Sequence, residues 1–497
     1  MRHNAKSGFS VLFMVLCTIA ASAQTMYVDS LFSANDSLLD VYQYQIPEGY
    51  NPDVPAPLLV GWHQWGGSYG EFMYTPFAAE ANTRGWIALG AWGGHSMNWT
   101  NQDTQEWMQL IIETLTEQWN IDWQRIYMVG GSMGGASGMI YSNNHLDPTR
   151  PMVAASASAS GILDDERRFI EQGINNSMIE VFGGTWEEVP FTYHRNSAIY
   201  FADSLNSMHS NLWHSASYLT YGTDETYHQY HALDLYEVLA RFADDVYIGA
   251  TVTGHGWGVF DVPHVCDWLE QYMLNSDPDT MAISADEDSR NYWTGVSLAA
   301  EEVFGLYSAQ RSSWSSMGIR YELDGLSNIA EFYLEEFDNA DDPETPLQVV
   351  VGSADSEFTF GFIRNHLEIE TAALLTRNGE TVWDWEEWPL NDTLSLNVAA
   401  YDTLELVFIP EAVAPETAPV QPRTRLEVLS AANSVQINWG AGPAVVVVYD
   451  LLGRELNRME ANRVPLLLKT NGFASGVYFL QAETEQGVQF GRFLVQH

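Results

Sequence analysis

One serine of this chain lies where it could act as a nucleophile. Residues 126–129 form an apolar run that predicts a buried strand, two glycines and Ser132 follow it, and residues 136–141 favour a helix. Gly-x-Ser-x-Gly between a strand and a helix is typical of a nucleophile elbow. Backbone angles on so sharp a turn are strained, and side chains at Gly130 and Gly134 would collide with the neighbouring strand and helix. A tightly packed turn or a phosphate loop would also suit these glycines, so other residues must supply the chemistry.

A serine hydroxyl is a poor nucleophile at neutral pH and needs an adjacent base. His255 directly follows a predicted strand at 246–252, and the glycines on either side of it let a loop bring the imidazole back over Ser132. We therefore predict His255 as the base. Three further histidines that begin or lie within predicted helices are expected to be solvated or structural: His228, His231 and His264.

An acid that orients this imidazole should follow the preceding strand, predicted at 214–221. Asp224 lies in the turn after that strand and would fix the tautomer and stabilise the imidazolium. Glu225, the next residue, is the competing carboxylate, and an aspartate here could also merely cap a turn. We predict Asp224 as the acid and keep Glu225 as the alternative.

An oxyanion hole needs two backbone N–H donors that are fixed before the charge develops. Met133, the residue after the serine, supplies one donor from the first turn of the helix. The second should come from the loop after the apolar strand at 57–62, which reads His-Gln-Trp-Gly-Gly. We predict the Trp65 amide, with Gln64 as the second choice.

The elements that must position these residues alternate between strand and helix from about residue 42 to 274. Such alternation with short connections predicts a mostly parallel, doubly wound sheet with helices on both faces. The stretch 164–211 is less regular and rich in aromatic residues, as expected of a lid or a substrate-facing insertion.

Beyond residue 276 the pattern changes to short apolar runs that predict strands. We predict five segments, which are a signal peptide at 1–23, an α/β catalytic domain at 24–276, an all-β sandwich-like module at 277–410, a proline-rich linker at 411–424 and a small β-sandwich at 425–497.

The N-terminal segment predicts export. Arg2 and Lys6 precede an apolar stretch that ends in Ala-Ser-Ala, and cleavage is expected after Ala23. The apolar stretch is short for a membrane span, and no later run is long enough. Cys266 would be the one cysteine left after cleavage, which excludes an internal disulfide and a thiolate metal cage.

The chain is strongly acidic, with a formal net charge of −44. The electrostatic field of so negative a chain repels nucleic acid and anionic membranes, so we expect no nucleic-acid partner and no insertion into a membrane. Life in a salty medium, where screening relieves self-repulsion, is the favoured explanation, and solubility of a secreted protein is the alternative.

With these motifs in place, residues 40–275 resemble the α/β-hydrolase superfamily, and more closely its secreted esterases of the polyhydroxyalkanoate depolymerase and feruloyl esterase type. Two departures are Gln64, where these esterases have glycine, and an acid loop that is one residue short and begins with Tyr221 instead of histidine. Prolyl-oligopeptidase-like peptidases share the elbow and the acid loop. The motifs that carry the resemblance are 63–67, 130–134, 221–224 and 254–257.

The C-terminal segment resembles the type A sorting domain of type IX secretion cargo. Its matching pieces are 448–454, 476–481 and 491–496. The resemblance implies passage across the outer membrane of a Bacteroidota-type bacterium with the type IX machinery as partner, followed by release or attachment to the cell surface. An ordinary small β-sandwich binding module is the alternative.

Together these features predict a secreted serine esterase with Ser132, His255 and Asp224 as its triad, acting on a small or polymeric ester without metal or cofactor. Two alternatives stay open, a serine peptidase of the same fold and a non-catalytic surface binding protein on a hydrolase fold.

Overall fold

The computed structural model describes most of the chain between residues 25 and 495. The described ranges are 25–173, 176–252, 254–314, 318–334, 346–363, 372–385, 393–409, 427–431, 434–439, 443–449, 455–462, 465–470, 472–473, 476–484 and 487–495. The predicted signal peptide and the predicted linker at 411–424 lie outside these ranges. The chain divides into two compact units, one ending at Ser276 and one beginning at Asp277.

An eight-stranded sheet forms the centre of the first unit, in the order β1-β2-β4-β3-β5-β6-β7-β8. Strands β3 to β8 run parallel to their neighbours, whereas β2 pairs antiparallel with both β1 and β4. The predicted doubly wound, mostly parallel sheet is therefore confirmed. The strands are β1 (Thr25–Phe32), β2 (Leu38–Ile46), β3 (Ala56–Trp62), β4 (Ile87–Ala91), β5 (Ile121–Gly131), β6 (Ala155–Ala159), β7 (Ala216–Gly222) and β8 (Val246–Thr251).

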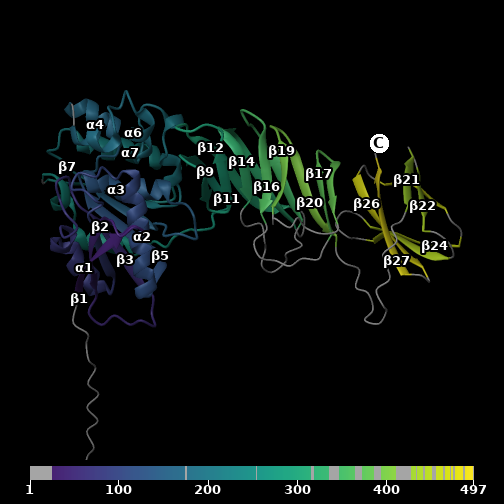
Figure 1. Cartoon of the computed structure of the whole chain (residues 1–497), viewed down its shortest axis with the longest axis horizontal. Coiled ribbons are helices and arrows are strands. Elements are labelled where there is room, and N and C mark those ends of the chain that lie inside the picture. The colour runs from purple at the N-terminus through teal and green to yellow at the C-terminus, as the bar shows by residue number, and fades with distance from the viewer. Residues whose placement is uncertain are drawn as a thin grey trace, which may run out of the picture. The chain divides into compact units, whose positions relative to one another are not determined.

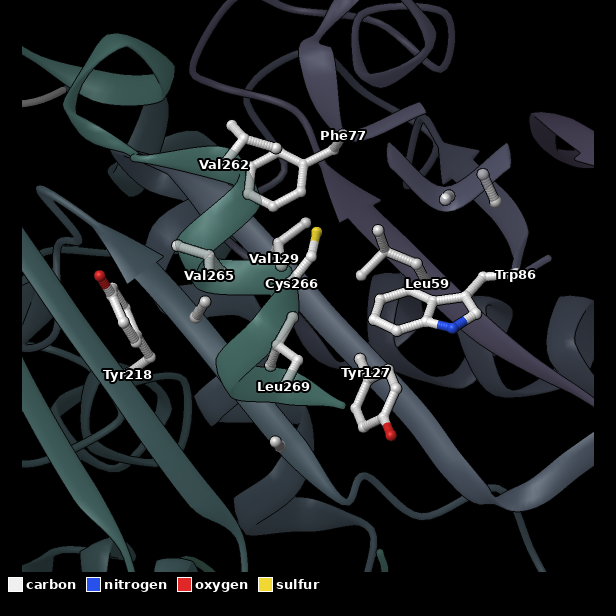
Figure 2. Close-up of a cluster of buried hydrophobic side chains, with 14 of the residues drawn as sticks. Leu59, Phe77, Trp86, Tyr127, Val129, Tyr218, Val262, Val265, Cys266 and Leu269 are labelled. Carbon is white, nitrogen blue, oxygen red and sulfur yellow. The ribbon is translucent and has the colours of Figure 1, made fainter. Parts of the chain in front are cut away.

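Helices cover both faces because successive strand residues point to opposite sides. Leu59 and its neighbours on one face pack under α1 (Pro76–Arg84) and α8 (Val262–Leu269), and Figure 2 shows Val262, Val265, Cys266 and Leu269 of α8 directed at this sheet surface. The other face packs under α2 (Gln102–Gln118), α3 (Met133–Asn144) and α7 (His228–Leu239). The inner parallel strands are thus buried on both faces, as their apolar runs require, whereas the edge strand β8 is only partly buried.

The stretch 164–211 forms short helices that lie near α7 (Figure 1). Arg167 at the start of this stretch forms an ion pair with Asp234 of α7, at 2.6 Å between Nη1 and Oδ2. The helices are α4 (Asp165–Gln172), α5 (Asn176–Phe182) and α6 (Pro190–Arg195), with the 3-10 turns η2 (Ser204–Asn206) and η3 (His209–Leu212).

The second unit consists of strands, as predicted. Residues 280–409 form a five-stranded sheet, β10-β11-β14-β16-β19, and a seven-stranded sheet, β18-β17-β20-β15-β13-β12-β9. Tyr307 of one sheet meets Phe332 of the other with ring centroids 5.1 Å apart, so the sheets pack face to face. The strands are β9 (Thr280–Ala285), β10 (Ser289–Asn291), β11 (Thr294–Leu298), β12 (Gly305–Trp314), β13 (Gly318–Ser327), β14 (Ile329–Leu334), β15 (Leu347–Val351), β16 (Phe358–Ile363), β17 (Ala372–Arg377), β18 (Glu380–Trp385), β19 (Thr393–Val398) and β20 (Thr403–Ile409).

The C-terminal segment adds a three-stranded sheet, β21-β22-β25, and a four-stranded sheet, β24-β23-β26-β27. Ile437 from the first sheet and Val446 from the second belong to one buried cluster, so these sheets also form a sandwich. Within the described ranges, no helix is long and apolar enough to cross a membrane. The strands are β21 (Glu427–Ala431), β22 (Ser434–Asn438), β23 (Ala444–Tyr449), β24 (Glu455–Ala461), β25 (Leu466–Lys469), β26 (Gly476–Thr484) and β27 (Gly487–Val495).

Candidate active site

Ser132 occupies the sharp turn between β5 and α3, with φ 57° and ψ −123°. A positive φ is costly for a residue with a side chain, and such strain persists only where the surrounding structure enforces it. The glycines on either side allow the turn. A Cβ at Gly130 would lie 2.0 Å from the carbonyl oxygen of Gly134, and a Cβ at Gly134 would lie 2.3 Å from that of Trp62. The turn therefore holds the hydroxyl of Ser132 at the carboxyl end of the central strand.

The structure brings His255 to this serine. Nε2 of His255 lies 2.6 Å from Oγ of Ser132, and Nδ1 lies 2.6 Å from Oε1 of Glu225. An ionised carboxylate only accepts hydrogen bonds, so Nδ1 carries the ring proton and Nε2 is free to accept the serine proton. Burial is the largest single effect on the pKa of Glu225 and would raise it, but hydrogen bonds with His255 and Ser160 and the charges of His255 and His228 together lower the pKa. The carboxylate therefore stays charged beside the ring.

The carboxylate on His255 is that of Glu225, and the preference for Asp224 was wrong. The turn after β7 is tight, because the Glu225 N–H donates to the Gly222 carbonyl at 3.1 Å, and the Gly222 N–H donates to Oε2 of Glu225 at 3.2 Å. This closure leaves Thr223 and Asp224 exposed at the tip and directs Glu225 back under the sheet edge. The acid loop is one residue too short for Asp224 to take this place, and the carboxylate of the next residue, Glu225, takes it instead.

Two backbone amides are candidates for the oxyanion donors. Among the described residues, the N–H groups of Met133 and Trp65 donate to no acceptor. The Gln64 N–H, the second choice, already donates to Oε1 of Glu71 at 3.1 Å. Gly134 packs directly against the Trp62 and His63 carbonyls, so the elbow and the loop after β3 lie side by side. This geometry favours the predicted pair, Met133 and Trp65.

Glu71, which sequence reasoning missed, links the oxyanion loop to the histidine loop. Its Oε1 accepts the Gln64 N–H at 3.1 Å and the indole N–H of Trp257 at 2.6 Å. Gln64 precedes the proposed oxyanion donor, and Trp257 follows His255 by two positions. One carboxylate oxygen therefore fixes both loops relative to each other. No motif in a single sequence signals this, because Trp257 lies 186 residues after Glu71 in the chain.

His228 also lies at the site, although it was expected to be solvated or structural. Its ring centroid is 4.5 Å from that of His255. Burial, followed by the charge on His255 when that ring is protonated, lowers the pKa of His228 to about 4. The neutral ring therefore adds no positive charge that would oppose protonation of His255. His231 instead accepts the Leu163 N–H and contacts Glu171, and His264 lies within α8.

The 164–211 insertion is tied to the oxyanion loop by one serine. Oγ of Ser177, in α5, accepts the indole N–H of Trp65 at 3.2 Å and that of Trp99 at 3.0 Å. Trp99 and Met133 pack into a buried cluster with aromatic residues of the insertion, such as Phe169. The Trp65 side chain is 53% exposed. The insertion thus supports the loop that carries the proposed oxyanion donor.

Among the described residues, no group of three or more His, Cys, Asp or Glu side chains is arranged to hold a metal ion. Cys266 is buried in the core under α8, where burial raises the pKa of its thiol to about 12. It is a packing residue.

Solved structures that resemble this chain include several hydrolases. A fluorophosphonate-binding serine hydrolase of Staphylococcus aureus matches at 13% identity and a TM-score of 0.39, over 50% of this chain and 99% of that one. An S-formylglutathione hydrolase of Agrobacterium tumefaciens matches at 11% identity and a TM-score of 0.39, over 51% of this chain and 98% of that one. An acetyl xylan esterase of Paenibacillus sp. R4 matches at 13% identity and a TM-score of 0.37, over 53% of this chain and 87% of that one.

No protein-family model matches the chain, and a search of curated proteins finds no match. The fold class is therefore stated from the sheet itself, which is mostly parallel with helices on both faces and is followed in the chain by the β-sheet unit. The chemistry must be derived from the geometry of the site itself.

Proposed function

We propose that this chain is a serine hydrolase that cleaves carboxylic esters through an acyl-enzyme. The observation that carries the proposal is the chain of two 2.6 Å contacts from Ser132 Oγ through His255 to Glu225. A serine, a base oriented by a carboxylate and two unoccupied amide donors are the parts that acyl transfer requires.

In the first half-reaction, Ser132 Oγ attacks the ester carbonyl carbon as Nε2 of His255 takes the hydroxyl proton. The carbonyl oxygen becomes an oxyanion, which the N–H groups of Met133 and Trp65 stabilise. Glu225 stabilises the imidazolium that has formed. The tetrahedral intermediate then expels the alcohol oxygen, which takes the proton from Nε2, and the acyl group remains on Ser132.

In the second half-reaction, water attacks the acyl carbon and gives a proton to Nε2. The new tetrahedral intermediate expels Ser132 Oγ, which takes that proton back. The products are the alcohol and the carboxylic acid, and the enzyme returns to its starting state. An ester suits this site because its carbonyl is less resonance-stabilised than that of an amide and an alkoxide is a better leaving group than an amide anion. The mechanism uses no group beyond these residues.

Labelling with a fluorophosphonate probe tests the nucleophile, and p-nitrophenyl acyl esters test the reaction. We expect wild type to label and to turn over the esters, and Ser132→Ala to do neither while keeping the wild-type melting temperature. Labelling of Ser132→Ala at the wild-type rate would reject Ser132 as the nucleophile. A wild type that does not label would favour the non-catalytic binding protein.

The peptidase alternative is separated from the esterase by a second substrate class. We expect p-nitrophenyl esters to be cleaved at least a hundred-fold faster than proline-containing peptide p-nitroanilides, measured as kcat/KM. Faster cleavage of the peptide substrates would assign the same site to a peptidase.

The predicted signal peptide and C-terminal domain lead to a proposal on location. The enzyme would be exported, moved through the type IX machinery and then released or held at the cell surface. A chain that ends at residue 423 should remain in the periplasm of the native host, whereas the full chain leaves the cell. Normal secretion of the shortened chain would contradict the sorting assignment.

A further inference from the structure

Three buried polar atoms without hydrogen-bond partners belong to α4 and to the first residue of α7, whose ring lies beside His255. They are Oδ2 of Asp165, Nε of Arg168 and Nδ1 of His228. Buried polar atoms in folded proteins are nearly always bonded, so orphaned ones call for a ligand or a water molecule. We call Asp165, Arg168 and His228 the Arg168 cluster.

The arrangement of α4 directs this cluster toward the site. Arg167 and Glu171 face α7, where Arg167 pairs with Asp234 and Glu171 contacts His231. Phe169 lies on another side of the helix, in the buried cluster with Met133 and Trp99. At about 100° per residue, Arg168 and Asp165 point between these two sides. That side of α4 lies between the side that contacts α7 and the side that packs with Met133, the residue after Ser132.

Electrostatic contacts place Arg168 near His255. The ring of His228, the first residue of α7, lies 4.5 Å from the His255 ring. The Arg168 guanidinium is close enough to His228 to help lower the pKa of that ring, after the larger effect of burial. The main chain also connects α4 to the elbow, because the Ile162 N–H donates to the Ser132 carbonyl at 3.3 Å. Arg168 is therefore linked to His255 through the ring of His228.

Arg168 and Arg167 differ in their partners. Arg167 is held by two carboxylates, Glu171 at 2.7 Å and Asp234 at 2.6 Å. Arg168 is half-buried, and the described residues provide it with no hydrogen bond and no ion pair. Desolvation lowers the pKa of its guanidinium, with Asp165 acting against that effect. Burying an unpaired guanidinium is costly unless a ligand supplies the missing acceptor.

The neighbouring carboxyl group, Asp165, is only 2% exposed. Burial, together with the nearby Asp164, raises its pKa well above the usual range, while the charge of Arg168 acts in the opposite direction. Burial thus favours the neutral carboxyl group, whose hydroxyl can donate a hydrogen bond. Burial also lowers the pKa of His228 to about 4, so Arg168 is the cationic member of the cluster.

We propose that the Arg168 cluster binds a carboxylate of the substrate, so that the enzyme prefers esters that carry a second, ionised carboxyl group. This inference rests on the proposed ester hydrolysis and names its substrate class. A guanidinium binds a carboxylate through two parallel N–H donors. The Asp165 hydroxyl and a ring N–H of His228 can donate to the same anion. The cluster acts in binding, and bond cleavage stays with Ser132, His255 and Glu225.

Matched pairs of esters test the preference on each side of the scissile bond. On the acyl side, mono-p-nitrophenyl adipate is compared with p-nitrophenyl hexanoate. On the alcohol side, p-acetoxybenzoate is compared with p-acetoxybenzamide. Each measurement is kcat/KM of the full-length chain, corrected for spontaneous hydrolysis. We expect a preference of at least about ten-fold for the anionic ester of one pair, since a charged hydrogen bond of this kind is worth that factor or more. No preference in either pair overturns the proposal.

Variants then assign the preference to its residue. Arg168→Gln should lower the ratio of anionic to neutral kcat/KM at least about ten-fold, and Arg168→Lys should lower it less because the charge remains. Arg167→Gln is the matched control and should leave the ratio at the wild-type value. A ratio that Arg168→Gln leaves unchanged, or that Arg167→Gln lowers equally, overturns the proposal. Failure of the proposed function itself looks different, because neither ester of any pair is then hydrolysed and Ser132 takes no fluorophosphonate.

Discussion

The pairing of His255 with Glu225 predicts opposite outcomes for two adjacent carboxylates. Glu225→Gln keeps the size and shape of the side chain but removes its charge. Asp224→Asn makes the same chemical change one residue earlier, at the exposed tip of the turn. We expect the first change to abolish most of the activity and the second to leave it within about five-fold of wild type, because exposed charges away from the reacting atoms contribute little.

The geometry sets the size of this loss. Nδ1 and Oε1 are 2.6 Å apart. Two unit charges at that distance interact by roughly 6 kcal/mol at an effective dielectric constant of about 20. The His255 side chain is 40% exposed and that of Glu225 6%, so water screens part of this interaction. With about 4 kcal/mol left to stabilise the imidazolium, kcat/KM should fall by roughly a thousand-fold. An amide can also hold the imidazole in the wrong tautomer, which acts in the same direction.

The assay is the initial rate of p-nitrophenyl ester hydrolysis, with the rate of fluorophosphonate labelling as a second readout of Ser132 reactivity. Circular dichroism and melting temperature verify that both variants fold. The Glu225 carboxylate also accepts the Gly222 N–H, a bond that the amide oxygen of glutamine can replace. Loss of activity at unchanged melting temperature therefore reports on the imidazole and not on the turn.

Either of two results would refute this reasoning. If Asp224→Asn costs more than Glu225→Gln, the loop adopts another conformation in solution and Asp224 is the acid. If both variants retain wild-type activity, His255 needs no carboxylate, and the catalytic role of the observed chain of contacts is wrong.

Further predictions concern the supports of the site. Glu71→Gln should lower kcat by roughly ten- to a hundred-fold with less change in KM, because it loosens two loops that place the oxyanion donor and the base; an unchanged kcat would show that Glu71 is not needed for positioning. Gly134→Ala should prevent stable folding or lower the melting temperature strongly, because its Cβ would lie 2.3 Å from a backbone carbonyl oxygen. Gly258→Ala is the control: its Cβ meets nothing within 4 Å, so this variant should have the wild-type melting temperature in a thermal scan. Burial lowers the pKa of His209 to about 4. Below about pH 6.5 this histidine therefore binds a proton in the unfolded chain but not in the folded chain. Its contribution to the free energy of unfolding is complete above that pH and is lost as the pH falls toward 4. Urea unfolding at pH 7 and pH 5 should therefore show a stability loss that is on the order of 1–2 kcal/mol larger in wild type than in His209→Gln, and an equal loss in both would contradict the buried, neutral state of His209.

Local features of the sequence indicated both the candidate nucleophile and the fold class. Gly130 and Gly134 flank a serine because any side chain there would strike the helix or the strand, and that constraint is visible as a motif. Alternation of apolar runs with helical periodicity predicts a parallel sheet, and the carboxyl ends of its strands gather the loops that follow them. His255 was found in this way, since it directly follows a strand.

Contacts between distant segments could be decided only by the tertiary structure. The choice of Glu225 over Asp224 depends on how tightly the turn after β7 closes, and a shift of one residue moves a side chain from water to the imidazole. Glu71 and Arg168 were missed because Trp257 and His228, which link them to the site, lie far from them in the chain. The sequence by itself singled out Ser132 as the candidate nucleophile, whereas the packing of those segments decided that Glu225 contacts His255 and that His228 lies beside it.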